Sequence, residues 1–267
     1  MNTAFIIIFA IALYSVRWTW WLKNRKGLKV LVYHKIGYPP RGSKLKDLWV
    51  TPESFEKQIS YLVKSGYRLI GFSDLKEIYE NSKSVDDIVI VTFDDGYENN
   101  YIYAYPILRR YRAKGNIFVV YNTIGKTNIW HNPETEAWIN MATEKQLIEM
   151  DKSGVIEFGS HTMNHPQLEK IPLEDAIWEI KESKKQLEKL FNKPILAFAY
   201  PYGNGAYNDK IRKVVLENYI FDFSFKQGIT PWPWEREKKS IERLFIRHNE
   251  TLFDLKLHIK KGLSRLF

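Results

Sequence analysis

The chain has 267 residues, enough for one large α/β domain or two small ones, and its 45% hydrophobic and 27% charged residues are typical of a globular protein. It has no cysteine, which excludes disulfides, Cys-ligated zinc and thiol nucleophiles, so any metal site must use histidines and carboxylates. The formal charge of +9 fits an anionic lipid, glycan or nucleic acid; because Lys and Arg are spread along the chain, we expect no nucleic-acid partner.

The amino terminus carries an uncharged apolar run at residues 3–16, followed by tryptophans at positions 18, 20 and 21. Counted together, the run and the tryptophan belt approach the about 20 residues that span a bilayer. We therefore expect a single-pass membrane anchor over residues 1–22. An apolar first strand or helix of the domain and a cleaved signal peptide are the alternatives, and the lack of a charge before the run fits the signal peptide poorly.

Positive charges follow the apolar run within residues 17–26, and only the terminal amine precedes it. By the positive-inside rule the catalytic domain would face the cytoplasm, although the side of the membrane stays open. We expect a membrane location in either case.

Residues 27–267 are predicted to form one catalytic domain. Continuous apolar runs predict strands at 28–33, 69–72, 88–93, 116–121, 156–160, 196–200 and 221–225. Helical patterns lie between them, beginning at Thr51 and ending at Gly66, then at 74–80 with Ser73 as the cap, 101–111, 144–152, 174–191 and 208–218. Residues 37–49 are expected to form a loop. Repeated strand–helix units with fully apolar strands indicate a parallel sheet or a barrel.

The carboxyl-terminal stretch 252–265 interleaves apolar and basic residues. This pattern fits a basic amphipathic helix lying on anionic lipid, which makes membrane lipid an expected partner. An ordinary packed terminal helix with a solvated lysine face is the alternative.

Reactive side chains follow three of the predicted strands. Asp94 and Asp95 come directly after one strand, His161 after a second with His165 four residues on, and a Pro-Tyr-Gly turn at 201–203 after a third. Active sites of parallel α/β folds collect at the carboxyl ends of the strands. We therefore expect these groups to share one site.

Adjacent carboxylates repel each other, and a divalent cation removes that cost. One carboxylate and two histidines form a three-ligand set with open positions for water and substrate, and the other Asp could take a proton from the attacking water. A lone Asp-Asp-Gly is commonly a turn, and a lone pair of histidines is often structural, but their joint placement favours a site. Zinc is the preferred metal, with cobalt, nickel, manganese or iron as alternatives.

Residues 92–97 (TFDDGY), 161–166 (HTMNHP) and 198–203 (FAYPYG) resemble the first three motifs of the polysaccharide deacetylase (NodB homology) family, carbohydrate esterase family 4. The order and spacing of the motifs also match. Residues 30–34 (VLVYH) resemble the first strand of the branch that contains poly-N-acetylglucosamine deacetylases. The likeness runs from about residue 28 to at least residue 225.

The resemblance implies a distorted (β/α) barrel with fewer than eight complete units. It implies that Asp94 is the general base and that Asp95, His161 and His165 bind the metal. The backbone N–H of Tyr202 would help to stabilise the oxyanion, a role that can contribute about 10²–10³ in rate. Ser160 or Thr162 would orient the ligands.

The chain departs from the family pattern in two motifs. The third motif lacks the Arg that pairs with the base in many members, so Arg247 or another cation is expected to replace it. The fourth motif is not clear, and Trp232 and Trp234 are candidates for a wall of the sugar site. The fifth motif is matched loosely by residues 244–248, which makes His248 the candidate general acid; a surface histidine in a basic patch is the alternative.

The sequence has three further histidines outside the motifs of the site. His34 follows the first strand and either lines the pocket or makes a structural hydrogen bond. His131 lies in a loop that resembles one near the family's substrate groove, although a surface role is the simpler reading. We expect His258 to lie on the surface of the terminal helix.

These features predict a metal-dependent N-deacetylase that removes acetyl groups from N-acetylated amino sugars of a polysaccharide or a lipid-linked glycan. The expected partners are that glycan or glycolipid and membrane lipid, and we expect a monomer. One alternative is a deformylase or amidase acting on another N-acyl glycolipid. The other is a membrane-tethered glycan-binding protein with an inactive site.

Overall fold

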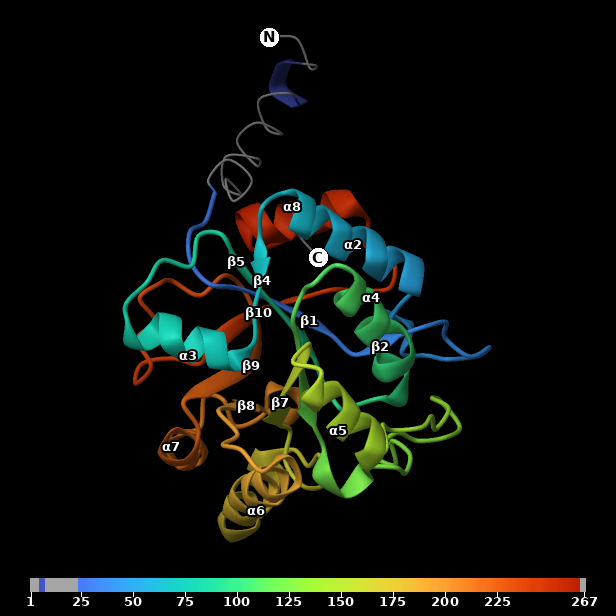
Figure 1. Cartoon of the computed structure of the whole chain (residues 1–267), viewed down its shortest axis with the longest axis vertical. Coiled ribbons are helices and arrows are strands. Elements are labelled where there is room, and N and C mark those ends of the chain that lie inside the picture. Colours follow the sequence, from blue (N-terminus) through green and yellow to red (C-terminus); the bar gives the residue numbers. More distant parts are fainter. Residues whose placement is uncertain (1–4, 8–23, 265–267) are drawn as a thin grey trace.

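Seven parallel strands form a closed barrel in the computed structural model, which describes residues 5–7 and 24–264. Strand β1 pairs with β10 on one side and with β5 on the other, and these two pairings close the sheet. Figure 1 shows the helices arranged around the barrel. The predicted α/β barrel is therefore confirmed for the described part of the chain.

The barrel strands are β1 (Lys29–Tyr33), β5 (Ile88–Phe93), β6 (Gly115–Val119), β7 (Ile156–Ser160), β8 (Ala197–Ala199), β9 (Phe221–Gln227) and β10 (Ile241–Phe245). The helices are α2 (Pro52–Lys64), α3 (Phe72–Glu80), α4 (Tyr105–Arg110), α5 (Glu144–Lys152), α6 (Leu173–Phe191), α7 (Asp209–Asn218) and α8 (Leu252–Lys261). Shorter elements are β2 (Lys35–Ile36), β3 (Trp49–Val50), β4 (Arg68–Leu69), a π-helical turn η3 (Asn100–Ala104) and four 3-10 turns, η2 (Lys46–Leu48), η4 (Tyr121–Thr123), η5 (Leu168–Lys170) and η6 (Pro201–Gly203).

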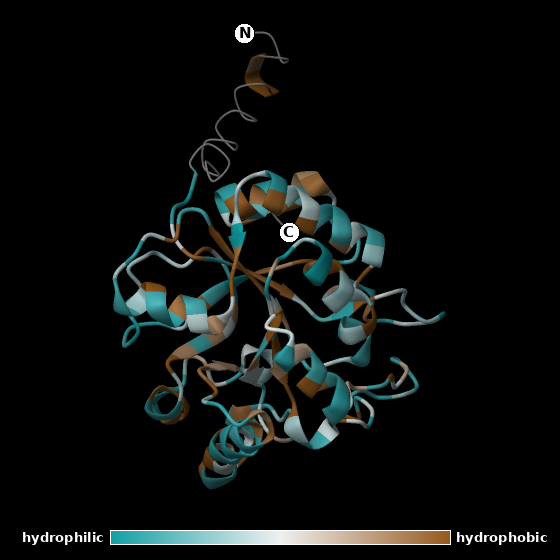
Figure 2. Ribbon diagram, in the orientation of Figure 1, coloured by the Kyte–Doolittle hydropathy of each residue, from teal (hydrophilic) through white to brown (hydrophobic). Residues whose placement is uncertain are grey.

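Side chains alternate along each strand, and this alternation creates two cores. One core fills the barrel and includes Val30, Ile90, Phe118, Ala199 and Phe223. The outward-facing residues between them pack against the surrounding helices in a second, larger core. Figure 2 shows the same division, with brown strands in the centre and helices that are brown on one side and teal on the other.

Strand β4 extends the barrel wall at its amino-terminal end. It pairs with the start of β5, whereas β6 pairs with the end of β5, so β4 occupies the space between β5 and β6. The buried Asn116 side chain joins these parts, because its Nδ2 donates to the carbonyls of Ile70 and Val91 and its Oδ1 accepts the Phe72 N–H. Packing of Phe72 against Phe118 then places α3 against the barrel interior.

Two helices begin or run differently from the prediction. Helix α3 is capped by Gly71 rather than Ser73, because the Asp74 carboxylate accepts the Gly71 N–H at 2.9 Å. The predicted helix at 101–111 consists of η3 followed by α4. Pro106 lies at the junction and has no N–H, so the regular helical hydrogen bond from this residue is missing.

The predicted membrane anchor over residues 1–22 lies almost entirely outside the described residues. Within residues 5–7 and 24–264, no helix is both long enough and apolar enough to cross a bilayer. At the other end of the chain, α8 is packed: Leu255, His258 and Ile259 are buried, and α8 lies beside α2 (Figure 1). The packing of α8 fits the packed-helix alternative, the contact with membrane lipid stays a prediction, and the prediction of a surface position for His258 was wrong.

Candidate active site

Four polar side chains reach the same end of the barrel because they share the inward face of their strands. Counting by two from interior residues of β1, β5 and β10 leads to His34, Asp94 and Arg243. In β7 the residues Ile156 and Phe158 belong to the outer core, so His161 falls on the inward face. Three of them directly follow the last residue of a strand, and Arg243 lies within β10. Their convergence at the carboxyl ends is thus a consequence of strand register.

The Asp94 carboxylate is held by Arg243 in a buried bidentate ion pair. Arg243 Nη1 and Nη2 donate to Asp94 Oδ1 and Oδ2 at 2.6 and 2.8 Å, and both side chains are at most 2% exposed. Burial acts to raise the pKa of Asp94, but Arg243 and the neighbouring imidazoles outweigh it and the pKa lies below its usual value. Asp94 is therefore ionised and fixed in orientation, as a proton acceptor must be.

The cation that replaces the missing third-motif Arg is thus Arg243, a residue that the sequence reasoning did not single out. Arg247, the named candidate, places its guanidinium over the Phe245 ring instead. A charged residue at an inward position of an apolar strand was the available signal, because a charge inside a barrel requires a partner.

Asp95, His161 and His165 form a cluster whose possible ligand atoms lie within 4.8 Å of one another. His161 Nε2 and His165 Nε2 lie 3.5 and 3.3 Å from Asp95 Oδ1, and all three side chains are buried. Burial acts to raise the pKa of Asp95, but the hydrogen bond and charge of His165 keep it far below the usual value. The structure thus brings together the three residues predicted to bind a metal.

The hydrogen bonding of His161 fits a metal ligand. Its Nδ1 lies 2.7 Å from the carbonyl oxygen of Ala199, which can only accept, so Nδ1 carries the proton and Nε2 presents a lone pair toward Asp95. Burial lowers the pKa of His161 to about 4, which keeps the ring neutral at pH 7. The donor set of one carboxylate and two imidazoles suits zinc and the other divalent metals named above.

The loop that carries both histidines is held in an unusual backbone conformation. Thr162 and His165 have positive φ values of 69° and 62°, a region that costs non-glycine residues energy and persists where surrounding contacts enforce it. Glu179 of α6 supplies such contacts, because its carboxylate accepts the N–H groups of Met163 and Asn164 at 2.8 and 2.9 Å. Thr162 Oγ1 also accepts the His165 N–H at 3.0 Å.

These groups line a pocket of about 290 Å³. Its polar residues are His34, Asp94, Asp95, His131, His161 and His165, and its apolar walls are Leu45, Leu48, Trp130, Tyr202 and Phe225. The rings of Trp130 and Tyr202 lie 4.5 and 4.6 Å from the ring of His165. The lining of the pocket therefore combines aromatic rings with charged and imidazole groups, a combination that suits an amide on a sugar ring.

Tyr202 lies in the turn after β8 with φ 58° and ψ 9°, so its backbone adopts the left-handed conformation. Gly203 follows with φ 70° and no room for a side chain, because an added Cβ would lie 2.6 Å from Phe225 Cβ. This turn brings Tyr202 to the pocket wall.

Not all predicted residues meet at the pocket. Among the described residues that line it, His248 is absent; its Nδ1 lies 3.0 Å from the Trp49 carbonyl oxygen. Trp232 and Trp234 pack against Tyr79 of α3, so neither forms a wall of this pocket. Their candidate role as a sugar wall is not supported by their position.

The remaining histidines differ from one another. His34 lines the pocket, its Nε2 lies 3.9 Å from Asp94 Oδ2, and its buried Nδ1 has no partner among the described residues. His131 also lines the pocket, 3.4 Å from Tyr97 Oη, and burial lowers its pKa to about 4. His258 is buried in α8 and does not line the pocket; its Nε2 lies 3.0 Å from Glu250 Oε1.

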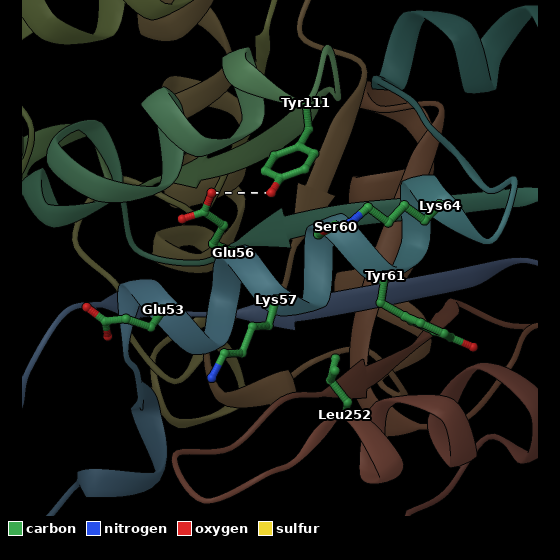
Figure 3. A pocket seen from close by; sticks show the side chains of 8 residues that line it. All are labelled: Glu53, Glu56, Lys57, Ser60, Tyr61, Lys64, Tyr111 and Leu252. Atoms are coloured by element: carbon green, nitrogen blue, oxygen red, sulfur yellow. Dashed lines mark hydrogen bonds between the residues drawn. The ribbon is translucent and has the colours of Figure 1, made fainter.

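A larger hollow of about 570 Å³ lies on the outer surface between α2 and the start of α8 (Figure 3). Its charged side chains come from α2 and include Glu56, Lys57 and Lys64, and Glu56 accepts a hydrogen bond from Tyr111 Oη at 3.3 Å. None of the predicted site residues lines it. Size alone therefore does not locate the chemistry in this molecule.

A closed parallel barrel with carboxylates and histidines at its strand ends defines an α/β-barrel protein with a site able to hold a divalent metal. Comparison with known proteins makes the class specific. The model of the polysaccharide deacetylase family matches residues 81–219, more than half of the chain. The chain belongs to this family, and relatives of it are named N-deacetylases, which are hydrolases acting on carbon–nitrogen bonds other than peptide bonds.

Relatives in sequence and structure agree. The poly-beta-1,6-N-acetyl-D-glucosamine N-deacetylase of Staphylococcus epidermidis is 30% identical over 223 residues, covering 79% of this chain and 73% of the relative. A polysaccharide deacetylase of Bacillus cereus superposes with a TM-score of 0.73 at 29% identity, covering 89% of this chain and 70% of that chain. A Streptococcus pyogenes deacetylase, solved in complex with acetate, has a TM-score of 0.74 at 28% identity and is covered to 99%, with 89% of this chain matched.

Proposed function

We propose that this protein is a metal-dependent N-deacetylase that releases acetate from N-acetylated amino sugars of a polysaccharide or lipid-linked glycan. The observation that carries the proposal is the ion pair of Asp94 with Arg243 directly beside the cluster of Asp95, His161 and His165. An oriented, ionised base next to a metal-binding set is what hydrolysis of an amide requires. The acetate in the Streptococcus pyogenes relative supports the same chemistry.

Asp95, His161 and His165 would hold the metal. When bound there, a divalent ion would polarise the acetamide carbonyl and lower the pKa of water. Asp94 takes the proton of the attacking water, since its carboxylate is fixed by Arg243 and needs no reorientation. The backbone N–H of Tyr202 donates to the oxygen that becomes negative as the tetrahedral centre forms.

The position of the histidines favours one of them as the donor of the proton to the departing amine. His248 was the candidate from sequence, but it does not line the pocket, whereas His34 lines it and places Nε2 3.9 Å from Asp94 Oδ2. Burial lowers the pKa of His34, although Asp94 and Asp95 oppose this, so the ring is neutral until a proton arrives. Asp94, once protonated, is the nearest source of that proton, and His34 then donates it to the amine nitrogen.

The proposal is tested with the full-length protein and N-acetylglucosamine oligomers, by measuring acetate release. A chelator should abolish release and added zinc should restore it. Asp94→Asn should lower kcat by about 10²–10⁴ without loss of metal binding. Metal-independent release, or full activity of Asp94→Asn, would refute the mechanism.

The two histidines can be separated in the same assay. His34→Asn should lower kcat by about 10²–10⁴, whereas His248→Asn should change it little. The reverse pattern would return the role of proton donor to His248.

The alternatives from sequence are less favoured. The family match and the complete set of polar groups in the pocket argue against a glycan-binding protein with an inactive site. Parallel assays with N-formyl and N-acetyl sugars distinguish a deformylase from a deacetylase. We also propose that residues 1–22 tether the domain of residues 27–267 to a membrane, where a glycan or glycolipid substrate would be close at hand.

A further inference from the structure

A buried ion pair lies behind the pocket wall, between Lys35 and Glu136. Lys35 Nζ lies 2.8 Å from Glu136 Oε1, and the two residues are 0% and 2% exposed. The ammonium group also lies 5.1 Å from the ring centres of Trp49 and Tyr97. Removing two charges from water costs about as much as their attraction returns, so such a pair adds little net stability. The pair therefore matters mainly through the positions of the groups that it connects.

The Glu136 carboxylate connects distant parts of the chain. Besides Lys35, it accepts hydrogen bonds from Ser43 Oγ at 2.6 Å and from Leu45 N and Trp49 Nε1 at 3.3 Å each. Burial acts to raise its pKa, but the bonds from Lys35 and Ser43 outweigh it and hold the pKa of Glu136 at about 2. All of these donors therefore meet a fully ionised acceptor at neutral pH.

The connected parts are the two mouth loops, which we define as residues 37–49 and 126–140. Leu45 and Leu48 of the first and Trp130 and His131 of the second all line the pocket. The loops touch directly at one further point, where Lys44 N donates to the Thr135 carbonyl at 3.2 Å. The bonds of Glu136 and this contact thus hold the two mouth loops together.

Lys35 adds a third part, because it directly follows His34 in the chain. Lys35 and Ile36 form β2, which pairs with Trp49 and Val50 of β3. The Lys35–Glu136 pair therefore ties both mouth loops to the strand end that presents His34, and neither charged group lines the pocket itself.

We infer that Glu136, together with Lys35, is a positioning residue that sets the width of the pocket mouth and so the fit of the glycan. The inference rests on the proposed deacetylase function for the identity of the ligand. Arg243 lies in β10, and His34, Asp94 and His161 directly follow β1, β5 and β7. The barrel strands therefore place all four groups, including His34, and the chemical step does not depend on the mouth loops. Loss of the pair should therefore weaken substrate binding more than it slows the reaction.

The test uses the full-length variant Lys35→Met/Glu136→Met, which removes both charges together. Glu136→Gln alone would leave Lys35 buried without a counter-charge and could fail to fold. Ser43→Ala is a milder second variant that removes one bond to the first mouth loop and keeps the ion pair. The control is Lys114→Met. Lys114 Nζ lies 2.7 Å from Asp74 Oδ2, and Lys114 directly precedes β6, so this ion pair lies at the amino-terminal end of the barrel, away from the pocket.

Two measurements are made on each variant: KM and kcat for N-acetylglucosamine oligomers, and hydrogen–deuterium exchange by mass spectrometry. For the double variant we expect KM to rise about tenfold or more with kcat within about twofold, and faster exchange in both mouth loops but not in β5 or β7. Ser43→Ala should show a smaller rise in KM and a smaller increase in the exchange of the mouth loops. Lys114→Met should leave KM and both loops unchanged.

A lower melting temperature with unchanged KM and unchanged loop exchange would show a merely structural pair and overturn the inference. Equal losses in kcat and kcat/KM would also overturn it, because the pair would then act on the chemistry. If the wild-type protein releases no acetate at all, the proposed function fails. The exchange measurement would still decide whether the pair positions the loops.

Discussion

At the residue scale, we expect the reactivity of Asp94 to depend on its ion pair with Arg243. In Arg243→Met the carboxylate loses its bidentate partner, so its pKa should rise from its lowered value. A base with a higher pKa is protonated already at higher pH, so the acid limb of the kcat/KM–pH profile should move upward. Because Asp94 would remain buried without its counter-charge, we also expect a loss of about 3–5 kcal/mol in the free energy of unfolding.

Arg247→Met is the matched control, since Arg247 lies over the Phe245 ring and not on Asp94. It should leave the acid limb in place. If Arg247→Met moved the limb and Arg243→Met did not, the assignment of the replacing cation would be wrong. The pH profile and urea unfolding of both variants provide the comparison.

The affinity for metal should depend on Glu179, which does not belong to the ligand set. Its carboxylate holds the backbone of Met163 and Asn164, between the two histidines, and in Glu179→Leu these N–H groups lose their acceptor. Groups that orient metal ligands typically contribute about 10–100-fold in affinity, and we expect a weakening of that size for zinc. Zinc titration of the metal-free protein against a chromophoric chelator measures it.

Glu188→Leu is the control on the same helix, because Glu188 accepts the Ile195 N–H at 3.0 Å and makes no bond to the histidine loop. Its zinc affinity should match that of the wild type. Equal zinc affinity in Glu179→Leu would show that the histidine loop keeps its conformation without this contact.

Strand alternation explains which site residues could be predicted from sequence. The positions of Asp94 and His161 directly after apolar strands are visible in the sequence, and the structure brings them together. Arg243 could not be identified from the expectation that site residues follow a strand, because it lies within β10 and reaches Asp94 from there. His34 was recognised as a possible pocket residue, but only the closure of β1 onto β5 shows that it lies near Asp94.

At the scale of elements, the turn at η6 is the part most sensitive to a single added carbon. Gly203 has φ 70°, and a Cβ there would lie 2.6 Å from Phe225 Cβ, a pocket-lining residue. Gly203→Ala should therefore cost about 1–2 kcal/mol for the left-handed backbone and more for the clash, and should also lower kcat by moving the Tyr202 N–H.

Gly154→Ala separates these two effects. Gly154 also has φ 70°, but nothing lies within 4 Å of its added Cβ, so this variant carries the backbone cost alone. For Gly154→Ala we expect a smaller loss in the free energy of unfolding, measured with urea, and acetate release equal to that of the wild type. If both variants lost the same free energy of unfolding and kept full activity, the close approach of Gly203 to Phe225 would not affect function.

Elements with strong local signals were predicted well. The strand at 88–93 and the helix at 144–152 have the predicted bounds, since each is a clean apolar or amphipathic run with a clear start. Residues 37–49 were predicted as a loop but contain η2 and the start of β3. Leu45 N and Trp49 Nε1, on either side of η2, donate to Glu136, which lies 87 residues beyond Trp49 in the chain. A contact over that separation leaves no local pattern.

At the scale of the whole molecule, the sequence predicts a parallel sheet or barrel but not how the barrel closes. Apolar strands alternating with helices indicate parallel pairing, but the number of strands depends on where the first and last strands meet. Here β1 lies between β10 and β5, and the short β4 completes the wall beside β5. The described domain thus has a closed sheet with cores inside and outside it, and it should fold without residues 1–22.

That expectation permits a test of the predicted membrane anchor. A chain that begins at Lys23 should remain folded, release acetate from soluble oligomers with a kcat like that of the full chain, and stay in the soluble fraction after cell lysis. The full chain should sediment with membranes, because an apolar run of this length with a tryptophan belt favours the bilayer. Immunoblots of the two fractions, together with circular dichroism of the shortened chain, provide the measurement.

Each outcome separates one of the interpretations weighed for the amino terminus. A full chain that stays soluble would refute the anchor, and a shortened chain that unfolds would make residues 1–22 an integral strand or helix of the domain. If the anchor is present, a reporter fused after Phe267 identifies the side of the membrane. Cytoplasmic activity of the reporter, which the charges at residues 17–26 favour, would point to a lipid-linked glycan made inside the cell, and activity on the other side would point to an exported polymer.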